Sequence, residues 1–164
     1  MFTLRVEMEA LDDADATLVE RLASMRWRLQ PLLAERRIAM EWVMPGEDED
    51  TSPGGEIGLQ LALLAQEAMS NAVQHSGSSC LRVLLQKDST KGWRLEVADK
   101  GRGMGALPAQ RGGNMQAQRG WGIDGMRNRA QRMGARFELE TAPGQGTCVR
   151  VWVPVATGTR STAP

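Results

Sequence analysis

Apolar side chains recur at helical spacing in three segments of the chain. The most regular segment covers residues 57–76, where the apolar positions fall on one arc of about 140° if successive residues are set about 100° apart. These positions are Leu61, Ala62, Ala65, Ala68, Met69, Ala72 and Val73. Similar spacing predicts further helices over roughly 16–36 and about 123–133, each with one face turned toward a core.

The ends of these helices carry recognisable signals, but the start of the chain does not. Residues 12–15 read Asp-Asp-Ala-Asp and supply candidate N-cap and first-turn acids for the first helix. Gly77 and Gly134 are expected to end the other two helices. Residues 3–11 fit an edge strand by their alternation and a helix by their apolar spacing, so both alternatives stay open.

Five short segments have the residue types and the alternation of strands. The expected strands are 38–44, 81–86, 93–98, 137–141 and 147–153. The second and third strands, and likewise the last two, are separated by short glycine-containing turns and predict hairpins. Helices and strands in this order predict a two-layer α/β sandwich, with a mixed, mostly antiparallel sheet covered on one face by helices.

Length and composition narrow the class of protein. The chain has 164 residues, which fits one domain, and it contains no apolar run of the roughly 18 residues that a membrane span needs. The two cysteines, Cys80 and Cys148, are too few for a disulfide scaffold or a four-ligand zinc site and suit a reducing compartment. We therefore expect a cytoplasmic domain that contacts neither a membrane nor nucleic acid.

The net charge of zero conceals an uneven distribution. Residues 1–67 carry 6 basic and 14 acidic residues, whereas residues 68–164 carry 14 basic and 6 acidic residues. Seven basic residues and one acid lie within 100–132, and 11 of the 18 glycines lie within 101–146. Such a basic, glycine-dense segment is typical of an anion-binding loop and equally of a flexible solvated loop, and composition alone does not separate the two.

Glu67 and Asn71 form a polar pair on the second predicted helix. They are four residues apart, so their side chains project from the same face. A carboxylate can act as a base, and a neighbouring carboxamide oxygen can bind a hard cation such as Mg²⁺. Taken alone, however, this spacing more often belongs to a solvated polar face.

Two glycine-containing segments are candidate ligand sites. Asp99 ends a predicted strand before Gly101 and Gly103, which would let a flat ligand approach while the carboxylate accepts from an amine, although a plain turn is the commoner meaning. Residues 120–125 read Gly-Trp-Gly-Ile-Asp-Gly but follow an irregular loop instead of a strand, which excludes a Rossmann site. Glycines at a helix N-terminus still expose amide groups to a phosphate.

Together with the turn at residues 144–147, these motifs resemble in order and spacing those of the GHKL (Bergerat-fold) ATPases. Within that superfamily the chain is most similar to the ATP-binding domain of sensor histidine kinases, in the branch that works with LuxR-type response regulators. The resemblance runs from about residue 18 to residue 154. Its parts are an N box at 66–75, glycine boxes at 99–103 and 120–126, and a final glycine-threonine motif at 144–147.

The resemblance implies a role for each polar candidate, with Mg-ATP as the ligand. Asn71 would bind the Mg²⁺ that bridges the triphosphate. Glu67 would assist the attack of a phosphoacceptor histidine. Asp99 would accept a hydrogen bond from the adenine amino group, helped by Thr147 through a water molecule.

The resemblance also assigns the glycines. Gly101 and Gly103 would allow the close approach of the nucleotide, and Gly120 and Gly122 would hinge a lid over about 104–119. The basic residues that cluster in this part of the chain would then lie near the triphosphate, which favours the anion-binding interpretation of the charge distribution.

Two features depart from the family pattern or limit what the chain can do. Lys100 stands where the family frequently has Asn or Asp. The only histidine, His75, lies inside the N box, so the chain carries no plausible phosphoacceptor and is not expected to autophosphorylate alone. Residues 1–11 are expected to be the tail of an upstream dimerisation helix, 12–155 the ATP-binding domain and 156–164 a disordered tail.

The sequence therefore predicts the ATP-binding catalytic domain of a two-component sensor histidine kinase whose parent could be membrane-anchored. Its expected partners are a histidine-bearing dimerisation domain and a response regulator of LuxR type. One alternative is a stand-alone serine kinase resembling anti-sigma factors, which the helix after the second glycine box disfavours. The other is a non-catalytic binding module, against which the intact Glu67, Asn71 and Asp99 argue.

Overall fold

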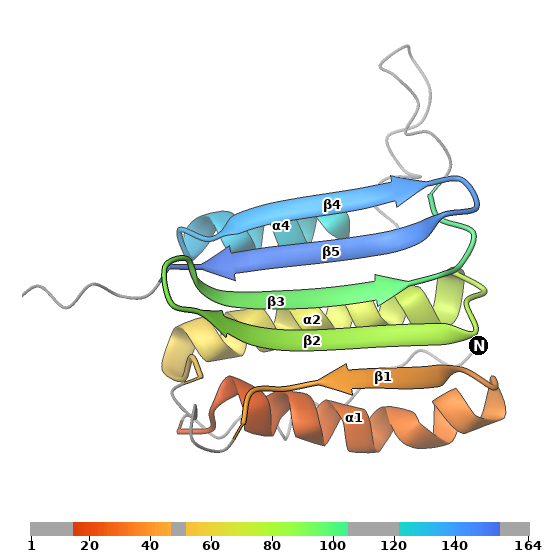
Figure 1. Ribbon diagram of the computed structural model, residues 1–164, viewed down its shortest axis with the longest axis horizontal. Coiled ribbons are helices and arrows are strands. Elements are labelled where there is room, and N and C mark those ends of the chain that lie inside the picture. Colours follow the sequence, from red (N-terminus) through yellow and green to blue (C-terminus); the bar gives the residue numbers. More distant parts are fainter. Residues whose placement is uncertain (1–14, 47–51, 105–121, 155–164) are drawn as a thin grey trace, which may run out of the picture.

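The computed structural model describes residues 15–46, 52–104 and 122–154, and these form one five-stranded sheet with three helices on one side (Figure 1). The strands are β1 (Ala39–Val43), β2 (Cys80–Asp88), β3 (Gly92–Asp99), β4 (Arg136–Ala142) and β5 (Gly146–Val153). Their order across the sheet is β1-β2-β3-β5-β4. Only the β1–β2 pair is parallel, which confirms the predicted mixed, mostly antiparallel sheet.

Three helices cover one face of this sheet, and the opposite face is open (Figure 1). They are α1 (Leu18–Glu35), α2 (Gly55–His75) and α4 (Ile123–Arg132). Every helix and strand lies within two residues of its predicted bounds. Gly77 and Gly134 follow the C-cap residues of α2 and α4 with φ of +64° and +65°, the conformation predicted for glycines that end helices.

The start of α1 corrects one prediction. The N-cap is Thr17 and not an acid of the 12–15 run, of which only Asp15 lies in the described residues. The Thr17 hydroxyl accepts the backbone N–H of Glu20, and the Glu20 carboxylate accepts the N–H of Thr17 at 2.7 Å. This reciprocal pair satisfies two amide groups that a helix leaves unpaired, an advantage that a single acidic cap does not offer.

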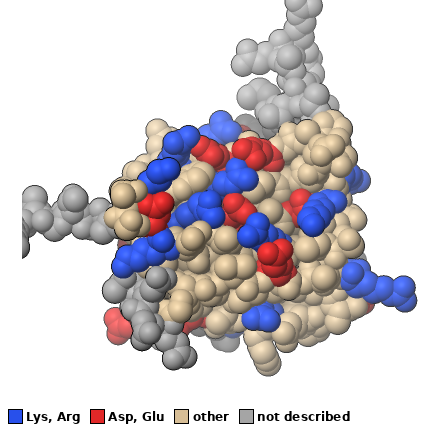
Figure 2. Space-filling view, viewed as in Figure 1, with Lys and Arg blue, Asp and Glu red and all other residues tan. Residues whose placement is uncertain are grey.

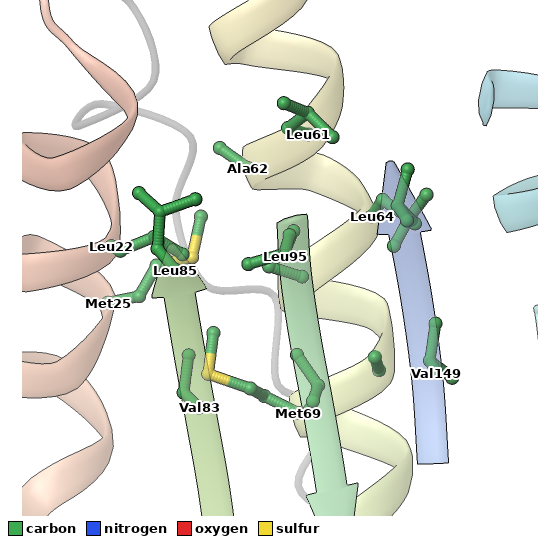
Figure 3. Packing of buried hydrophobic residues seen from close by; sticks show 14 of the residues in the cluster. Leu22, Met25, Leu61, Ala62, Leu64, Met69, Val83, Leu85, Leu95 and Val149 are labelled. Atoms are coloured by element: carbon green, nitrogen blue, oxygen red, sulfur yellow. The ribbon is translucent and has the colours of Figure 1, made fainter. Parts of the chain in front are cut away.

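The core lies between the sheet and the helices, and the predicted apolar arc of α2 is its centre. All seven residues of that arc are buried. They pack against Leu22 and Met25 of α1 and against Val83, Leu85 and Leu95 of the sheet (Figure 3). The polar side of α2 is thereby fixed toward solvent and toward the ends of neighbouring elements.

The open face of the sheet is lined by charge. Glu41, Arg82, Glu96, Arg150 and Glu140 come from the five strands in turn and pair in sequence across the sheet, and Figure 2 shows acidic and basic side chains interspersed on this face. Glu96 lies at the centre of this ion-pair ladder and is only 6% exposed. Its carboxylate lies 2.8 Å from Nε of Arg150 and 3.7 Å from a guanidinium nitrogen of Arg82.

Several predicted features fall outside the described residues. These are the segment 1–11, Gly120, the tail 156–164 and all of the expected lid except Met104. Among the helices that the structure does describe, none is both long enough and apolar enough to span a membrane.

Candidate functional site

Four of the predicted site residues, Asn71, Asp99, Gly103 and Thr147, line one narrow cleft at the edge of the helix-covered face. Asn71 comes from α2, Asp99 from the end of β3 and Thr147 from the start of β5. Ala68, Val97, Met126 and Val149 are among the residues that make the rest of the lining largely apolar. A cleft with apolar walls and a few converging polar groups is the usual form of a small-molecule site. Its cavity is about 20 Å³, which is room for about one water molecule, so a ligand as large as a base would have to widen it.

The Asp99 carboxyl group lies at the end of β3. Its Oδ1 accepts the backbone N–H of Gly101 at 2.8 Å. Burial raises the pKa of Asp99 above its usual value, and nearby donors, the Gly101 N–H first, offset part of that rise. A carboxylate has about four acceptor positions, so Asp99 keeps acceptor capacity beyond this hydrogen bond.

Thr147 belongs to a row of polar side chains that crosses three strands. It pairs in register with Asp99 on β3 and with Thr141 on β4. The Thr141 and Thr147 hydroxyl oxygens lie 3.1 Å apart, and the Thr141 hydroxyl also accepts the N–H of Met104 at 2.8 Å. The beginning of the segment after β3 is therefore tied to the β4–β5 hairpin.

Gly101 and Gly103 pack where no side chain fits. A Cβ on Gly101 would lie 2.2 Å from the carbonyl oxygen of Ser76, and one on Gly103 would lie 2.0 Å from the carbonyl oxygen of Ala142. Their small size thus lets the protein backbone close on itself around Asp99. The space that these glycines would leave for a nucleotide stays a prediction.

Glu67 opens into a different cavity from Asn71. Its exposed side chain lines a groove of about 400 Å³ that runs over α2 between α1 and α4, together with Arg28, Arg129 and Gly122. A Cβ on Gly122 would lie 2.1 Å from Oε1 of Glu67, so the N-terminus of α4 sits directly on this carboxylate. The two residues that were predicted to act side by side therefore face separate cavities.

The structure adds residues that sequence reasoning missed. Ser76, Ser78 and Thr141 all bond to the segment that begins at Asp99. The pairing of Thr141 with Thr147 follows from the predicted hairpin and could have been found by counting outward from its turn. The two serines follow the N box, and only the contact between α2 and β3 reveals their use.

Lys100 and His75 are not among the residues that line the cleft. The Lys100 side chain is exposed, and its backbone N–H donates to the hydroxyl of Ser78 at 3.0 Å. His75 is the last residue of α2 and is half-buried. Within the described residues no group of three or more His, Cys, Asp or Glu side chains could hold a metal ion.

The comparison with known proteins identifies the family. The family described as "Histidine kinase-, DNA gyrase B-, and HSP90-like ATPase" matches residues 56–157, which hold the cleft. The chain belongs to this family.

The chain is similar to parts of sensor histidine kinases, and it shares its fold with solved histidine kinase domains. The sensor histidine kinase LiaS of Bacillus subtilis is 30% identical over 72% of the chain, which covers 29% of LiaS. The histidine kinase domain of the Erythrobacter litoralis EL346 blue-light-activated kinase is 23% identical with a TM-score of 0.63, over 91% of this chain and 68% of that one.

A second solved structure, full-length ShkA in complex with AMPPNP, has a TM-score of 0.66 at 18% identity, over 86% of this chain and 30% of that one. Both structures share the fold of the ATPase domain described here. The curated relatives are longer proteins, and the chain spans about a third of the length of LiaS and DegS.

Proposed function

We propose that this chain binds Mg-ATP and provides the catalytic domain of a sensor histidine kinase, which transfers the γ-phosphate to a histidine on a dimerisation domain outside the chain. The observation that carries the proposal is the convergence of Asn71, Asp99 and Thr147 on one apolar-walled cleft. The relatives are sensor histidine kinases, and the similar ShkA structure contains the ATP analogue AMPPNP, which supports a nucleotide as the ligand.

Asp99 is the residue that recognises the base in this proposal. Its carboxylate keeps acceptor capacity after the hydrogen bond from the Gly101 N–H, and the adenine amino group is a matching donor. Thr147 assists through a water molecule that its hydroxyl can hold. Gly101 and Gly103 have no side chain, so the base can approach the backbone there closely. Gly120 and Gly122 would be the hinge of the segment that closes over the phosphates.

Asn71 fits a site for Mg²⁺ that is shared with the nucleotide. A single carboxamide oxygen is enough for this ion, because Mg²⁺ keeps several water ligands and takes its others from substrate phosphates. When bound, the ion neutralises phosphate charge. Asn71 lies on α2 five residues before Ser76, and both residues line the cleft together with Asp99.

Glu67 would accept the proton of the attacking histidine. Its carboxylate is exposed and opens outward to the groove between α1 and α4, away from the base-binding cleft. A histidine on another domain can approach this side without entering the cleft. Separate cavities for Glu67 and Asp99 thus fit a reaction in which the nucleotide and the protein substrate arrive from different sides.

The partners follow from the same proposal. The dimerisation domain would precede residue 1, with residues 1–11 as the end of its second helix. The phosphoryl group would pass on to a response regulator, of LuxR type by the sequence resemblance. The domain would work in the cytoplasm, and its parent could be held at a membrane by segments outside this chain.

A transfer assay tests the proposal. The chain is incubated with γ-labelled ATP, Mg²⁺ and the dimerisation domain of a related kinase such as LiaS. We expect label on the dimerisation domain that is stable to alkali and lost in acid, as phosphohistidine is, and none when Glu67→Gln replaces the wild type. Acid-stable label would instead indicate a serine kinase, and label that is independent of the chain would contradict the proposal.

A further inference from the structure

Thr141 on β4 belongs to the row of residues that continues through Thr147 on β5 to Asp99 on β3. Thr147 is among the residues that line the cleft, and Thr141 is not. The Thr141 hydroxyl accepts the backbone N–H of Met104 at 2.8 Å. Its oxygen also lies 3.1 Å from the carbonyl oxygen of Gly146 and 3.1 Å from the hydroxyl oxygen of Thr147. Three such contacts equal the full capacity of a hydroxyl group, which has one proton and two acceptor lone pairs.

Only one arrangement of protons satisfies all three contacts. The Gly146 carbonyl oxygen carries no proton, so its contact with Thr141 requires the Thr141 hydroxyl to donate. The Met104 N–H occupies one lone pair of the Thr141 oxygen. The second lone pair is left for Thr147, whose hydroxyl is therefore the donor between the two threonines. One network thus orients both hydroxyl groups.

The orientation of the Thr147 hydroxyl decides what it can offer to the cleft. Its proton points to Thr141, so only its oxygen lone pairs remain for a group in the cleft. A water molecule or a ligand N–H can donate to these lone pairs, whereas an acceptor cannot bond to them. Without the Thr141 hydroxyl the Thr147 proton loses its partner and the group is free to rotate, so the site is less preorganised.

We propose that Thr141 is a positioning residue of the nucleotide site, which fixes the Thr147 hydroxyl as a hydrogen-bond acceptor toward the cleft. The inference rests on the proposed function, because it requires a bound nucleotide that Thr147 assists through a water molecule. Thr141 does not touch the nucleotide in this account. It acts through Thr147 alone, and its hydrogen bond with the Met104 backbone is a separate, structural contact.

A double-mutant cycle separates positioning from a general structural role. The affinity for ATP is measured by calorimetric titration with Mg²⁺ present, on the full chain and on the variants Thr141→Val, Thr147→Val and both together. Valine has a similar shape to threonine but no hydroxyl. We expect Thr141→Val to lower the affinity about fivefold in the wild type. In the Thr147→Val background we expect it to change the affinity less than about twofold, because the hydroxyl that it positions is gone.

Matched variants make the result specific. Thr141→Ser keeps the hydroxyl and is expected to retain the wild-type affinity for ATP. Thr90→Val removes a hydroxyl that bonds to Asp88 in the turn before β3, at the end of that strand away from Asp99, and is expected to leave the affinity unchanged. If Thr141→Val does not fold, Thr141→Cys carries a weaker donor and acceptor and is expected to lower the affinity in the same direction.

The outcomes are distinct. An equal loss of ATP affinity from Thr141→Val in both backgrounds would mean that the residue acts through Met104 or the fold and not through Thr147, which would overturn the positioning role. Unchanged affinity in the folded Thr141→Val variant would overturn it as well, and both results leave ATP binding by the wild type intact. A wild-type chain that does not bind ATP would overturn the proposed function, and this inference with it.

Discussion

The two faces of the sheet are built from the same strands, but one is apolar and covered by helices and the other is charged and open. On the helix-covered face, odd-numbered β3 residues such as Leu95 and Val97 enter the core, and Asp99 continues that row into the cleft. On the open face, Glu96 lies between Arg82 and Arg150 in the ion-pair ladder. One face is closed by apolar packing and ends in a binding cleft, whereas the other pairs its charges among themselves and offers none of its central groups to a ligand.

This contrast shows why a ligand site is more readily formed at the end of β3 than at the centre of the sheet. A single strand alternates its side chains, so β3 supplies residues of the core, the Asp99 carboxylate of the cleft and the centre of the ion-pair ladder. Asp99, the acid proposed to bind the ligand, lies at the end of β3, where the β3–β5 pairing ends and the C-terminus of α2 is close by. The variants below test whether the two faces are as separate as the structure indicates.

The largest effect on stability is expected in the core of the covered face. Leu85→Ala removes a side chain that is 1% exposed and packed against the helices, which is expected to lower the free energy of unfolding by about 3 kcal/mol. Val43→Ala on the open face removes a side chain that is 38% exposed and should cost less than about 1 kcal/mol. Urea unfolding of both variants measures the contrast, and equal losses would argue against it.

The junction between the core and the cleft is expected to couple stability to binding. Gly101→Ala places a methyl group against the backbone of Ser76, so α2 and the segment after β3 must move apart, at about 2 kcal/mol and with loss of ATP affinity. Gly54→Ala is the control, because a Cβ there meets no atom within 4 Å. Unfolding curves and ATP titrations on both variants provide the check, and unaltered ATP binding by Gly101→Ala would show that this packing does not shape the cleft.

The ion-pair ladder should be separable from the cleft. Glu96→Gln leaves the Arg82 and Arg150 guanidinium groups with their outer partners Glu41 and Glu140 only, so we expect a loss of about 1 kcal/mol that shrinks at high salt. Glu96 also raises the pKa of Arg150, which indicates a real interaction between the two groups. ATP affinity is expected to be unchanged, and a clear change in it would mean that the two faces are coupled.

A smaller effect is expected from the protonation of Asp99. Burial raises the pKa of this carboxyl group, so in the folded chain it takes up a proton at a higher pH than in the unfolded chain. Its contribution to stability therefore decreases as the pH rises from the unfolded pKa to the folded one. Adenosine needs the ionised form, so its affinity should weaken as the pH falls through the raised pKa.

Adenosine is the suitable ligand for that titration because it has no phosphate that titrates in the same range. Asp99→Asn is the control and should bind adenosine weakly and without this pH dependence. A wild-type affinity that stays constant as the pH is lowered toward 4, the usual range of a carboxyl group, would show that the adenosine does not bond to an ionised Asp99.

Much of the fold followed from the spacing of apolar residues. The arc on α2 fixed its buried face because only one side of that helix is apolar, and glycines after Ser76 and Met133 marked helix ends. Patterns of this kind depend only on residues that are close in sequence, so a single sequence reveals them. The order of the motifs likewise predicted one shared site for Asn71, Asp99 and Thr147, and all three line one cleft.

What the sequence could not show depends on contacts between distant residues. The ion-pair ladder needs the register of β2, β3 and β5, which places Glu96 opposite Arg150, and no local pattern states it. The hydrogen bond from the Arg102 N–H to the carbonyl oxygen of Ser76 needs the end of α2 to meet the segment after β3. The position of Glu67 in the groove between α1 and α4 depends on the packing of α4, whose Gly122 lies against the Glu67 carboxylate.

The central claim is that Asp99 recognises adenine in the cleft between α2 and the sheet, and a titration of ATP and Mg²⁺ into the wild type and Asp99→Asn tests it most directly. The substitution keeps the shape of the side chain and removes the charged acceptor. We predict that the wild type binds ATP and that Asp99→Asn binds it about 10- to 100-fold more weakly while unfolding at a similar urea concentration. Equal ATP affinity in the two folded proteins would contradict the account.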